Sequence, residues 1–195
     1  MRIIAGEFRG RRLEAPKGQG TRPTTDRVRE SLMSAIHSAR GGFEGAVVLD
    51  AFAGSGGLGM EALSRGPAAA VFCERDREAA SVIERNLRTL GLTRDRARLV
   101  RGDGLKRPPA PPAGGRFDLV FLDPPYATAP AVVLDFVRPL DASGFLTAYT
   151  LVCYEHDGAD DEAVESLAAE AGWAIASHRR FGDTAIDLME RLCTG

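Results

Sequence analysis

Cysteine and histidine are scarce in this chain, and the few that occur are scattered. The 195 residues include 3 cysteines and 3 histidines. None of them has the close spacing that is typical of metal ligands or of a disulfide framework. We therefore expect no bound metal, and we expect the cysteines to be reduced, buried thiols. We assign no catalytic or metal-binding role to the histidines.

Long apolar segments are also absent. No run approaches the length that a membrane-spanning helix needs, and no signal-peptide pattern opens the chain. We therefore predict a cytoplasmic protein without a membrane partner. A length of 195 residues, with 44% hydrophobic and 27% charged residues, fits one soluble domain with a substantial core. No long apolar surface helix is evident in the sequence, so we expect a monomer.

The basic residues are concentrated at the N-terminus. The whole chain has a net charge of −2, yet residues 1–40 hold nine basic and four acidic residues, which leaves the remainder at −7. A basic arm on an acidic body favours phosphate contacts in the arm, and a solvated charged face is the alternative. We accordingly divide the chain into a basic extension at 1–40 and a catalytic domain at 41–195. The predicted phosphate-binding residues are Arg9, Arg11, Arg12, Arg22, Arg27 and Arg29. Pairing within the helix, such as Asp26 with Arg29, is the competing interpretation for some of them.

The extension itself reads as a hairpin followed by a helix. Short extended segments at 1–5 and 11–15 flank Gly6 and Gly10, which indicates a small hairpin. Thr24 or Thr25 can cap a helix whose apolar positions follow helical spacing, and a glycine pair at 41–42 ends it.

From residue 46 onward, strand and helix patterns alternate. The predicted strands are 47–49, 69–73, 97–100, 117–122, 146–154, 173–180 and 185–191, and the predicted helices are 57–64, 76–90, 132–140 and 160–171. This alternation predicts an α/β fold, with a Rossmann-like, doubly wound, mostly parallel sheet of seven strands. The last two strands have no helix between them, which predicts an antiparallel hairpin at the sheet edge. Ligands of such sheets bind at the carboxyl ends of the strands.

A glycine-rich turn follows the first of these strands. Gly54, Gly56 and Gly59 match a dinucleotide-binding fingerprint, and Glu74 lies where a ribose-binding acid is expected. This pattern alone is compatible with NAD or with S-adenosylmethionine (AdoMet). Asp50 favours AdoMet, because a carboxylate at the strand end repels a pyrophosphate and attracts a sulfonium and an ammonium group.

The pattern from Asp50 to Gly56 resembles the first motif of the class I AdoMet-dependent methyltransferases. Two further acids, Glu74 and Asp103, follow the second and third strands, where that class contacts the ribose and the adenine amine. The resemblance implies that AdoMet is bound by Asp50, Phe52, Ala53, Gly54, Gly56, Glu74, Arg75, Asp103, Gly104 and Leu105. In related enzymes the segment before the first strand also covers the cofactor. Thr24, Thr25 and Arg27 are therefore candidates for cofactor or RNA contact, and we assign Thr25 to the cofactor.

A stiff acceptor-rich segment, Asp123-Pro124-Pro125-Tyr126, follows the apolar strand at 117–122. Each proline fixes its own φ and biases the preceding residue toward extended geometry. Because the prolines have no N–H, this hook offers carbonyl oxygens, a carboxylate and an aromatic ring. Such a set suits a flat base with an exocyclic amine. A proline-rich turn without function is the alternative, and the combination of all four residues argues against it.

The hook resembles the catalytic motif of the amino-methyltransferases. The segments at 2–13 and 20–32 further resemble signatures of the RsmD family. That resemblance implies methylation of guanine N2 in 16S ribosomal RNA by Asp123, Pro124, Pro125 and Tyr126, with AdoMet as methyl donor. The implied partner is ribosomal RNA, the 30S subunit or an assembly intermediate, bound through the basic arm. DNA adenine-N6 or cytosine-N4 methylation, NAD-dependent oxidoreduction and a non-catalytic RNA-binding module are the competing readings.

Overall fold

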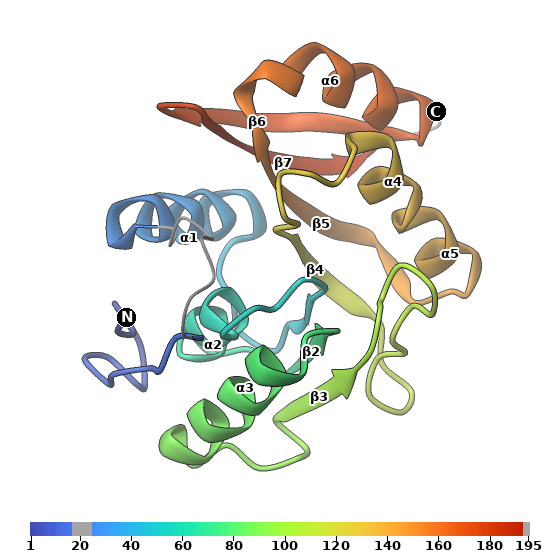
Figure 1. The fold of residues 1–195 in the computed structure, drawn as a ribbon. Coiled ribbons are helices and arrows are strands. Elements are labelled where there is room, and N and C mark those ends of the chain that lie inside the picture. The colour runs from blue at the N-terminus through green and yellow to red at the C-terminus, as the bar shows by residue number, and fades with distance from the viewer. Residues whose placement is uncertain (17–24, 193–195) are drawn as a thin grey trace.

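One seven-stranded sheet organises the computed structural model, which describes residues 1–16 and 25–192 (Figure 1). The strand order is β3-β2-β1-β4-β5-β7-β6. The strands are β1 (Val47–Asp50), β2 (Ala69–Glu74), β3 (Ala97–Arg101), β4 (Phe117–Leu122), β5 (Leu146–Asp157), β6 (Trp173–Phe181) and β7 (Thr184–Arg191). The helices are α1 (Asp26–Arg40), α2 (Gly57–Leu63), α3 (Arg77–Leu90), α4 (Pro130–Asp135), α5 (Val137–Ala142) and α6 (Asp161–Glu170), with a 3-10 turn at Gly158–Asp160.

The predicted doubly wound architecture is confirmed. Strands β3, β2, β1, β4 and β5 run parallel, whereas β7 is antiparallel to both of its neighbours. The β6–β7 hairpin closes one edge of the sheet, as predicted, with β7 inside and β6 outermost. Because β7 is antiparallel to β5, the turn between β6 and β7 lies at the end of the sheet where β4 and β5 have their carboxyl ends. Thr184, the first residue of β7, pairs there with Asp157, the last residue of β5.

Helices cover both faces of the sheet, and each face has its own hydrophobic core. One core joins the N-terminal segment, α1, α2 and α3 to the sheet and includes Phe8, Ile36, Phe72 and Phe121. The other core lies under α4, α5 and α6 (Figure 1). The N-terminal segment therefore packs into the same body as the sheet, because Ile3, Phe8 and Leu13 are all buried.

Helix α1 begins and ends where the sequence predicts. The Thr25 side chain accepts a hydrogen bond from the Val28 N–H, and Gly41 takes the left-handed conformation with φ 78° at the C-cap. A glycine adopts that conformation without a Cβ penalty. Hydrogen bonds connect α1 to the β6–β7 hairpin, because the Arg179 guanidinium of β6 donates to the Ser31 carbonyl and hydroxyl of α1.

Two predicted elements differ in detail. The helix expected at 132–140 is divided into α4 and α5 around Phe136. Pro139 explains the division, because it has no N–H to bond the Asp135 carbonyl and its ring clashes with that group. The N-terminal hairpin holds a single antiparallel bridge, Arg2 with Arg12. The Ile4 and Ala5 N–H groups bond Glu61 and the Glu14 N–H bonds Asn86, so no regular ladder forms.

Candidate active site

The strand-end carboxylates converge at one edge of the sheet. Asp50 ends β1 and pairs in register with Phe121 of β4 and Phe72 of β2. Burial raises the pKa of Asp50 to about 7, with further contributions from the charges of Asp123 and Glu74. Asp50, at the end of β1, therefore lies close enough to the acids at the ends of β2 and β4 for their charges to act on it, as parallel strand topology requires.

The Asp50 carboxylate is held at the start of α2. Its Oδ2 accepts a hydrogen bond of 2.9 Å from the Gly59 N–H, which lowers the pKa and partly offsets the effect of burial. A side chain at Gly59 would overlap the Phe72 ring and would lie 3.0 Å from that carboxylate oxygen. This glycine therefore permits the close packing of α2 on the sheet.

The glycine turn and Glu74 hold each other in place. Gly54 has φ 55° and Gly56 has φ 81°, both in the left-handed region. The Gly54 N–H donates to Glu74 Oε2 at 2.7 Å, and the Asp76 N–H donates to Glu74 Oε1 at 2.7 Å. One lone pair on each oxygen remains for a ligand. Arg75, which follows Glu74, is exposed.

Asp103 belongs to the same acidic group. Its carboxylate accepts from the Leu105 N–H at 3.1 Å, so it also shapes the local turn. Burial raises the pKa of the Cys73 thiol to about 11, and the charges of Glu74, Asp103 and Asp50 add to this effect. Gly104 lies against this thiol, since a Cβ there would be 3.1 Å from Cys73 Sγ.

Phe52 and Leu105 pack against the hydrophobic core that lies under α4, α5 and α6. The Phe52 ring meets the Phe136 ring edge to face, with centroids 6.5 Å apart. Leu105 and Phe136 both border a surface groove of about 460 Å³ beside α4 and α5. Phe52 and Leu105 come shortly after β1 and β3 in the sequence, and their assignment to the cofactor stays a prediction.

The hook after β4 has a buried base and an exposed tip. Asp123 is half-buried and Pro124 is buried, whereas Pro125 and Tyr126 are exposed. Burial raises the pKa of Asp123 to about 6. The Tyr126 hydroxyl shares a hydrogen bond of 2.8 Å with Thr184 Oγ1, so the edge hairpin supports the ring. Thr184 was not predicted, because nothing in the local sequence links it to position 126.

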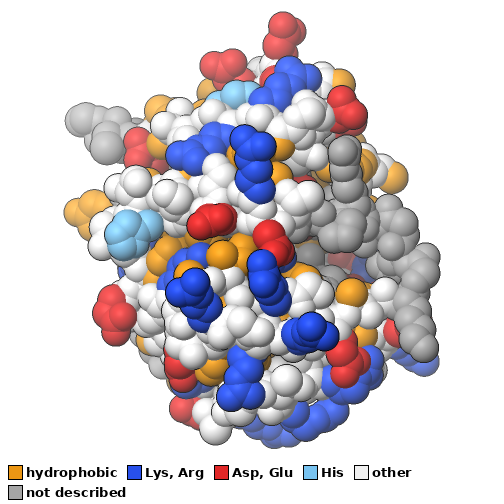
Figure 2. Space-filling view, turned by 90° about the vertical axis from the view of Figure 1, so that its left-hand side faces the viewer, with side chains coloured by type: hydrophobic (Ala, Val, Ile, Leu, Met, Phe, Trp, Pro, Cys, Tyr) orange, Lys and Arg blue, Asp and Glu red, His pale blue; other side chains and the backbone are white. Residues whose placement is uncertain are grey.

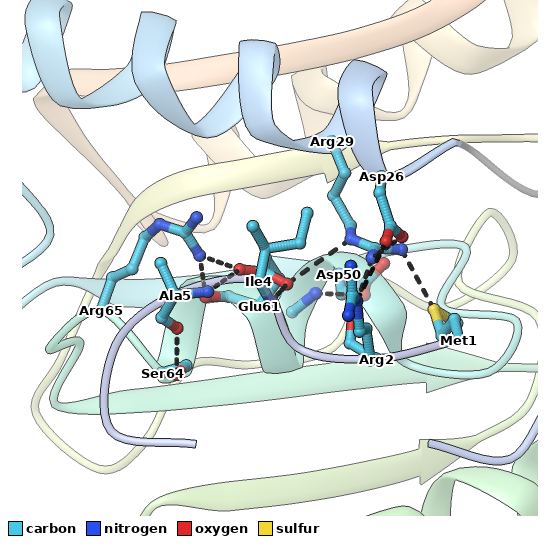
Figure 3. Close-up of polar contacts among 11 residues, drawn as sticks. Met1, Arg2, Ile4, Ala5, Asp26, Arg29, Asp50, Glu61, Ser64 and Arg65 are labelled. Carbon is cyan, nitrogen blue, oxygen red and sulfur yellow. Dashed lines mark hydrogen bonds and ion pairs between the residues drawn. The ribbon is translucent and has the colours of Figure 1, made fainter. Parts of the chain in front are cut away.

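Arg29 corrects the predicted phosphate-binding set. It is buried, with 2% of its surface exposed. Its guanidinium donates to the Asp26 carboxylate at 2.8 Å and to the Arg2 carbonyl at 2.9 Å, and it pairs with Glu61 (Figure 3). The predicted pairing of Asp26 with Arg29 is therefore confirmed. A guanidinium enclosed in this way cannot reach a phosphate.

The other arm residues have different environments. Arg9, Arg11, Arg12 and Arg27 are exposed, and Thr25 is exposed with its hydroxyl in the helix cap. Arg22 and Thr24 lie outside the described residues. Figure 2 shows that Lys and Arg side chains gather over the lower half of the face that carries the N-terminal segment. The assignment of these residues to RNA or cofactor stays a prediction.

Polar groups on buried helix faces were also missed. Glu61 in α2 and Asn86 in α3 are 0% and 1% exposed, and both bond the N-terminal segment. A signal existed for each, since a polar residue interrupts the apolar face of its helix. Asp187 in β7 is likewise buried between His156 and His178, at 3.0 and 2.7 Å. No signal in the local sequence indicates these two histidine contacts.

Fold and site together define a Rossmann-like protein of the methyltransferase type. A family profile described as "Conserved hypothetical protein 95" matches residues 1–190. The chain belongs to this family, and the predicted likeness to the RsmD family is confirmed.

Named relatives agree with this placement. The chain is 34% identical over 196 residues to "Ribosomal RNA small subunit methyltransferase D" of Escherichia coli K12, covering 100% of this chain and 92% of the relative. It is 42% identical over 164 residues to "Putative rRNA methyltransferase YlbH" of Bacillus subtilis, covering 80% and 83%. The solved structure "Putative methyltransferase yhhF" of Escherichia coli superposes with a TM-score of 0.80 at 32% identity, covering 98% and 97% of the two chains.

Proposed function

We propose that this protein transfers a methyl group from AdoMet to the exocyclic N2 of a guanine in small-subunit ribosomal RNA. Ribosomal RNA methylation follows from the family and from the names of relatives that cover most of the chain. The choice of amine as acceptor follows from the hook at residues 123–126. The observation that carries the proposal is the meeting of this hook with the acidic glycine-turn site at one sheet edge.

The residues at the strand ends fit a cationic cofactor. Burial raises the pKa of Asp50 to about 7, and the charges of Asp123 and Glu74 repel its carboxylate. A sulfonium and an ammonium group would relieve this repulsion, whereas the pyrophosphate of NAD would add to it. Asp50 would face the cationic part, Glu74 the ribose hydroxyls and Asp103 the adenine amine. When bound, AdoMet supplies an electrophilic methyl carbon.

The hook can activate an aryl amine without a metal or a covalent intermediate. The amine lone pair is delocalised into the base, which makes the nitrogen a weak nucleophile. Hydrogen bonds from its two N–H groups to the Asp123 carboxylate and the Pro124 carbonyl favour a pyramidal nitrogen and stabilise the positive charge that develops. With AdoMet bound, the N–C bond would form as the C–S bond breaks, S-adenosylhomocysteine would leave, and the surplus proton would pass to water.

Tyr126 and the N-terminal arginines would hold the RNA. The exposed Tyr126 ring offers a stacking plane for a base turned out of its helix, which contributes about 1–3 kcal/mol in single-strand binders. Arg9, Arg11 and Arg12, which are exposed, would bind phosphates of the RNA backbone. The raised pKa of Asp123, about 6, leaves its carboxylate ionised and able to accept at neutral pH.

The direct test uses small ribosomal subunits from a strain that lacks the protein. Incubation with AdoMet labelled in the methyl group, followed by nuclease digestion and mass spectrometry, identifies the modified atom. We expect one labelled guanine carrying the methyl on N2. Label on a ring carbon, on ribose or on an adenine would reject the assigned acceptor. In a parallel incubation with DNA in place of the subunits, label on the DNA would support the competing amino-methyltransferase interpretation.

A further inference from the structure

Asn86 connects the N-terminal segment to the glycine turn. It lies on α3 and is 1% exposed. Its Oδ1 accepts from the Glu14 N–H at 2.8 Å, and its Nδ2 donates to the Glu14 carbonyl at 3.1 Å. The second Nδ2 proton goes to the Ser55 carbonyl at 3.0 Å. One buried amide therefore bonds both the end of the basic segment and the middle of the turn.

A second attachment lies at the other end of the segment. The Ile4 and Ala5 N–H groups donate to the two carboxylate oxygens of Glu61 at 2.9 and 3.2 Å (Figure 3). Glu61 belongs to α2, the helix that begins directly after the glycine turn, and it also pairs with Arg65 and Arg29. A buried carboxylate with these partners fixes the segment firmly on α2.

The exposed arginines lie between these two attachments. Arg9, Arg11 and Arg12 follow the residues bound by Glu61 and precede the residue bound by Asn86. RNA contacts that restrain these arginines therefore also restrain Glu14. Because Asn86 bonds both Glu14 and Ser55, the same contacts restrain the Ser55 carbonyl, between Gly54 and Gly56.

We infer that Asn86 is a positioning residue that couples RNA binding at the basic segment to AdoMet binding at the glycine turn. This inference rests on the proposed function. RNA contacts that hold the segment in this position also hold the turn through Asn86, so each ligand raises the affinity of the other by the same factor. Asn86 does not touch the reacting atoms. Its effect passes through the position of the Ser55 carbonyl.

The test measures binding of labelled S-adenosylhomocysteine, which has no transferable methyl group, by equilibrium dialysis. Each protein is measured alone and with excess small ribosomal subunits from a strain lacking it. For the unmodified protein we expect the subunits to tighten binding about fivefold or more. Asn86→Asp keeps the oxygen and loses the Nδ2 donors. For this variant we expect binding about tenfold weaker without subunits, and we expect the ratio of the affinity with subunits to the affinity without them to be near one.

A second perturbation comes from the segment side. Glu14→Pro removes the N–H that donates to Asn86 Oδ1, at an exposed position. This variant tests the coupling even if Asn86→Asp fails to fold. Glu14→Ala and Arg85→Ala serve as matched controls, because they remove only the exposed Arg85–Glu14 ion pair between the same two elements. Both controls should keep the unmodified ratio.

The outcomes separate the inference from the proposed function. Loss of the ratio in each of Asn86→Asp and Glu14→Pro that folds, with both controls unchanged, supports the coupling. An unmodified protein that binds S-adenosylhomocysteine equally with and without subunits overturns it, as does a folded Asn86→Asp or Glu14→Pro variant with the full ratio. An unmodified protein that binds no S-adenosylhomocysteine at all would reject the proposed function instead.

Discussion

Asp50→Asn should stabilise the free protein while weakening its hold on AdoMet. Asp50 is 1% exposed, and its pKa rises from 3.8 to about 7 on folding. A carboxyl group with a raised folded-state pKa destabilises the fold once the pH exceeds its unfolded value, and the full cost is reached above the folded value. Asparagine keeps an oxygen for the Gly59 N–H and removes the charge.

The shift sets the size of the effect. At about 1.4 kcal/mol per pKa unit, the charge on Asp50 costs on the order of 4 kcal/mol at pH 8 and about 1 kcal/mol at pH 4.5. Asp50→Asn should recover a substantial part of that cost at pH 8 and little at pH 4.5. The measurement is the free energy of unfolding in urea at both pH values, for both proteins, without ligand.

The same variant should lose affinity for AdoMet, because the carboxylate that faces the sulfonium and ammonium groups is gone. Calorimetry at pH 8 should give binding at least tenfold weaker than that of the unmodified protein. A stability gain over the unmodified protein that is no larger at pH 8 than at pH 4.5 would refute the assigned burial cost. Unchanged affinity would refute the role of Asp50 in holding the cofactor.

Further substitutions test the hook, the arm and the fold. Asp123→Ala should abolish methyl transfer and leave AdoMet binding largely intact, and activity of the unmodified protein should fall as the pH drops through about 6, where the acceptor carboxylate becomes protonated. Tyr126→Phe should lower turnover several-fold, and adding Thr184→Val should lower it little further, because both remove the same hydrogen bond. Gly6→Ala should destabilise the protein strongly, since its Cβ would overlap the Ser64 carbonyl, whereas Gly10→Ala, which has φ +80° and open space, should cost only backbone strain. Replacing Arg9, Arg11 and Arg12 together with alanine should remove three phosphate contacts. The slope of log K for RNA binding against log salt concentration should then become shallower by about 2. An unchanged slope would exclude the arm as the RNA-binding element.

The strand-end acids could be predicted because local sequence determines them. Alternation of strand and helix implies a parallel sheet, and the carboxyl ends of its strands share one edge. Asp50, Glu74, Asp103 and Asp123 each follow an apolar strand, so topology alone brings them together. The helix that begins after Thr25 was equally visible, because its cap and its terminal glycine are local signals.

Contacts between distant segments could not be predicted in this way. Arg29 has the same sequence character as Arg27, yet its place opposite Glu61 buries it. The bond between Tyr126 and Thr184 depends on how the edge hairpin returns beside β5. Asn86 showed a signal, a polar residue on the buried face of α3, but its partners Glu14 and Ser55 are set by tertiary packing.

The central claim is that the hook and the glycine turn present an amine and a methyl donor to each other. A crystal structure of the protein with AdoMet bound tests it most directly. We predict that the sulfonium methyl points toward the Asp123 carboxylate and the Pro124 carbonyl, with the ammonium group near Asp50. A methyl that faces away from residues 123–126, out of reach of any base held there, would contradict the account.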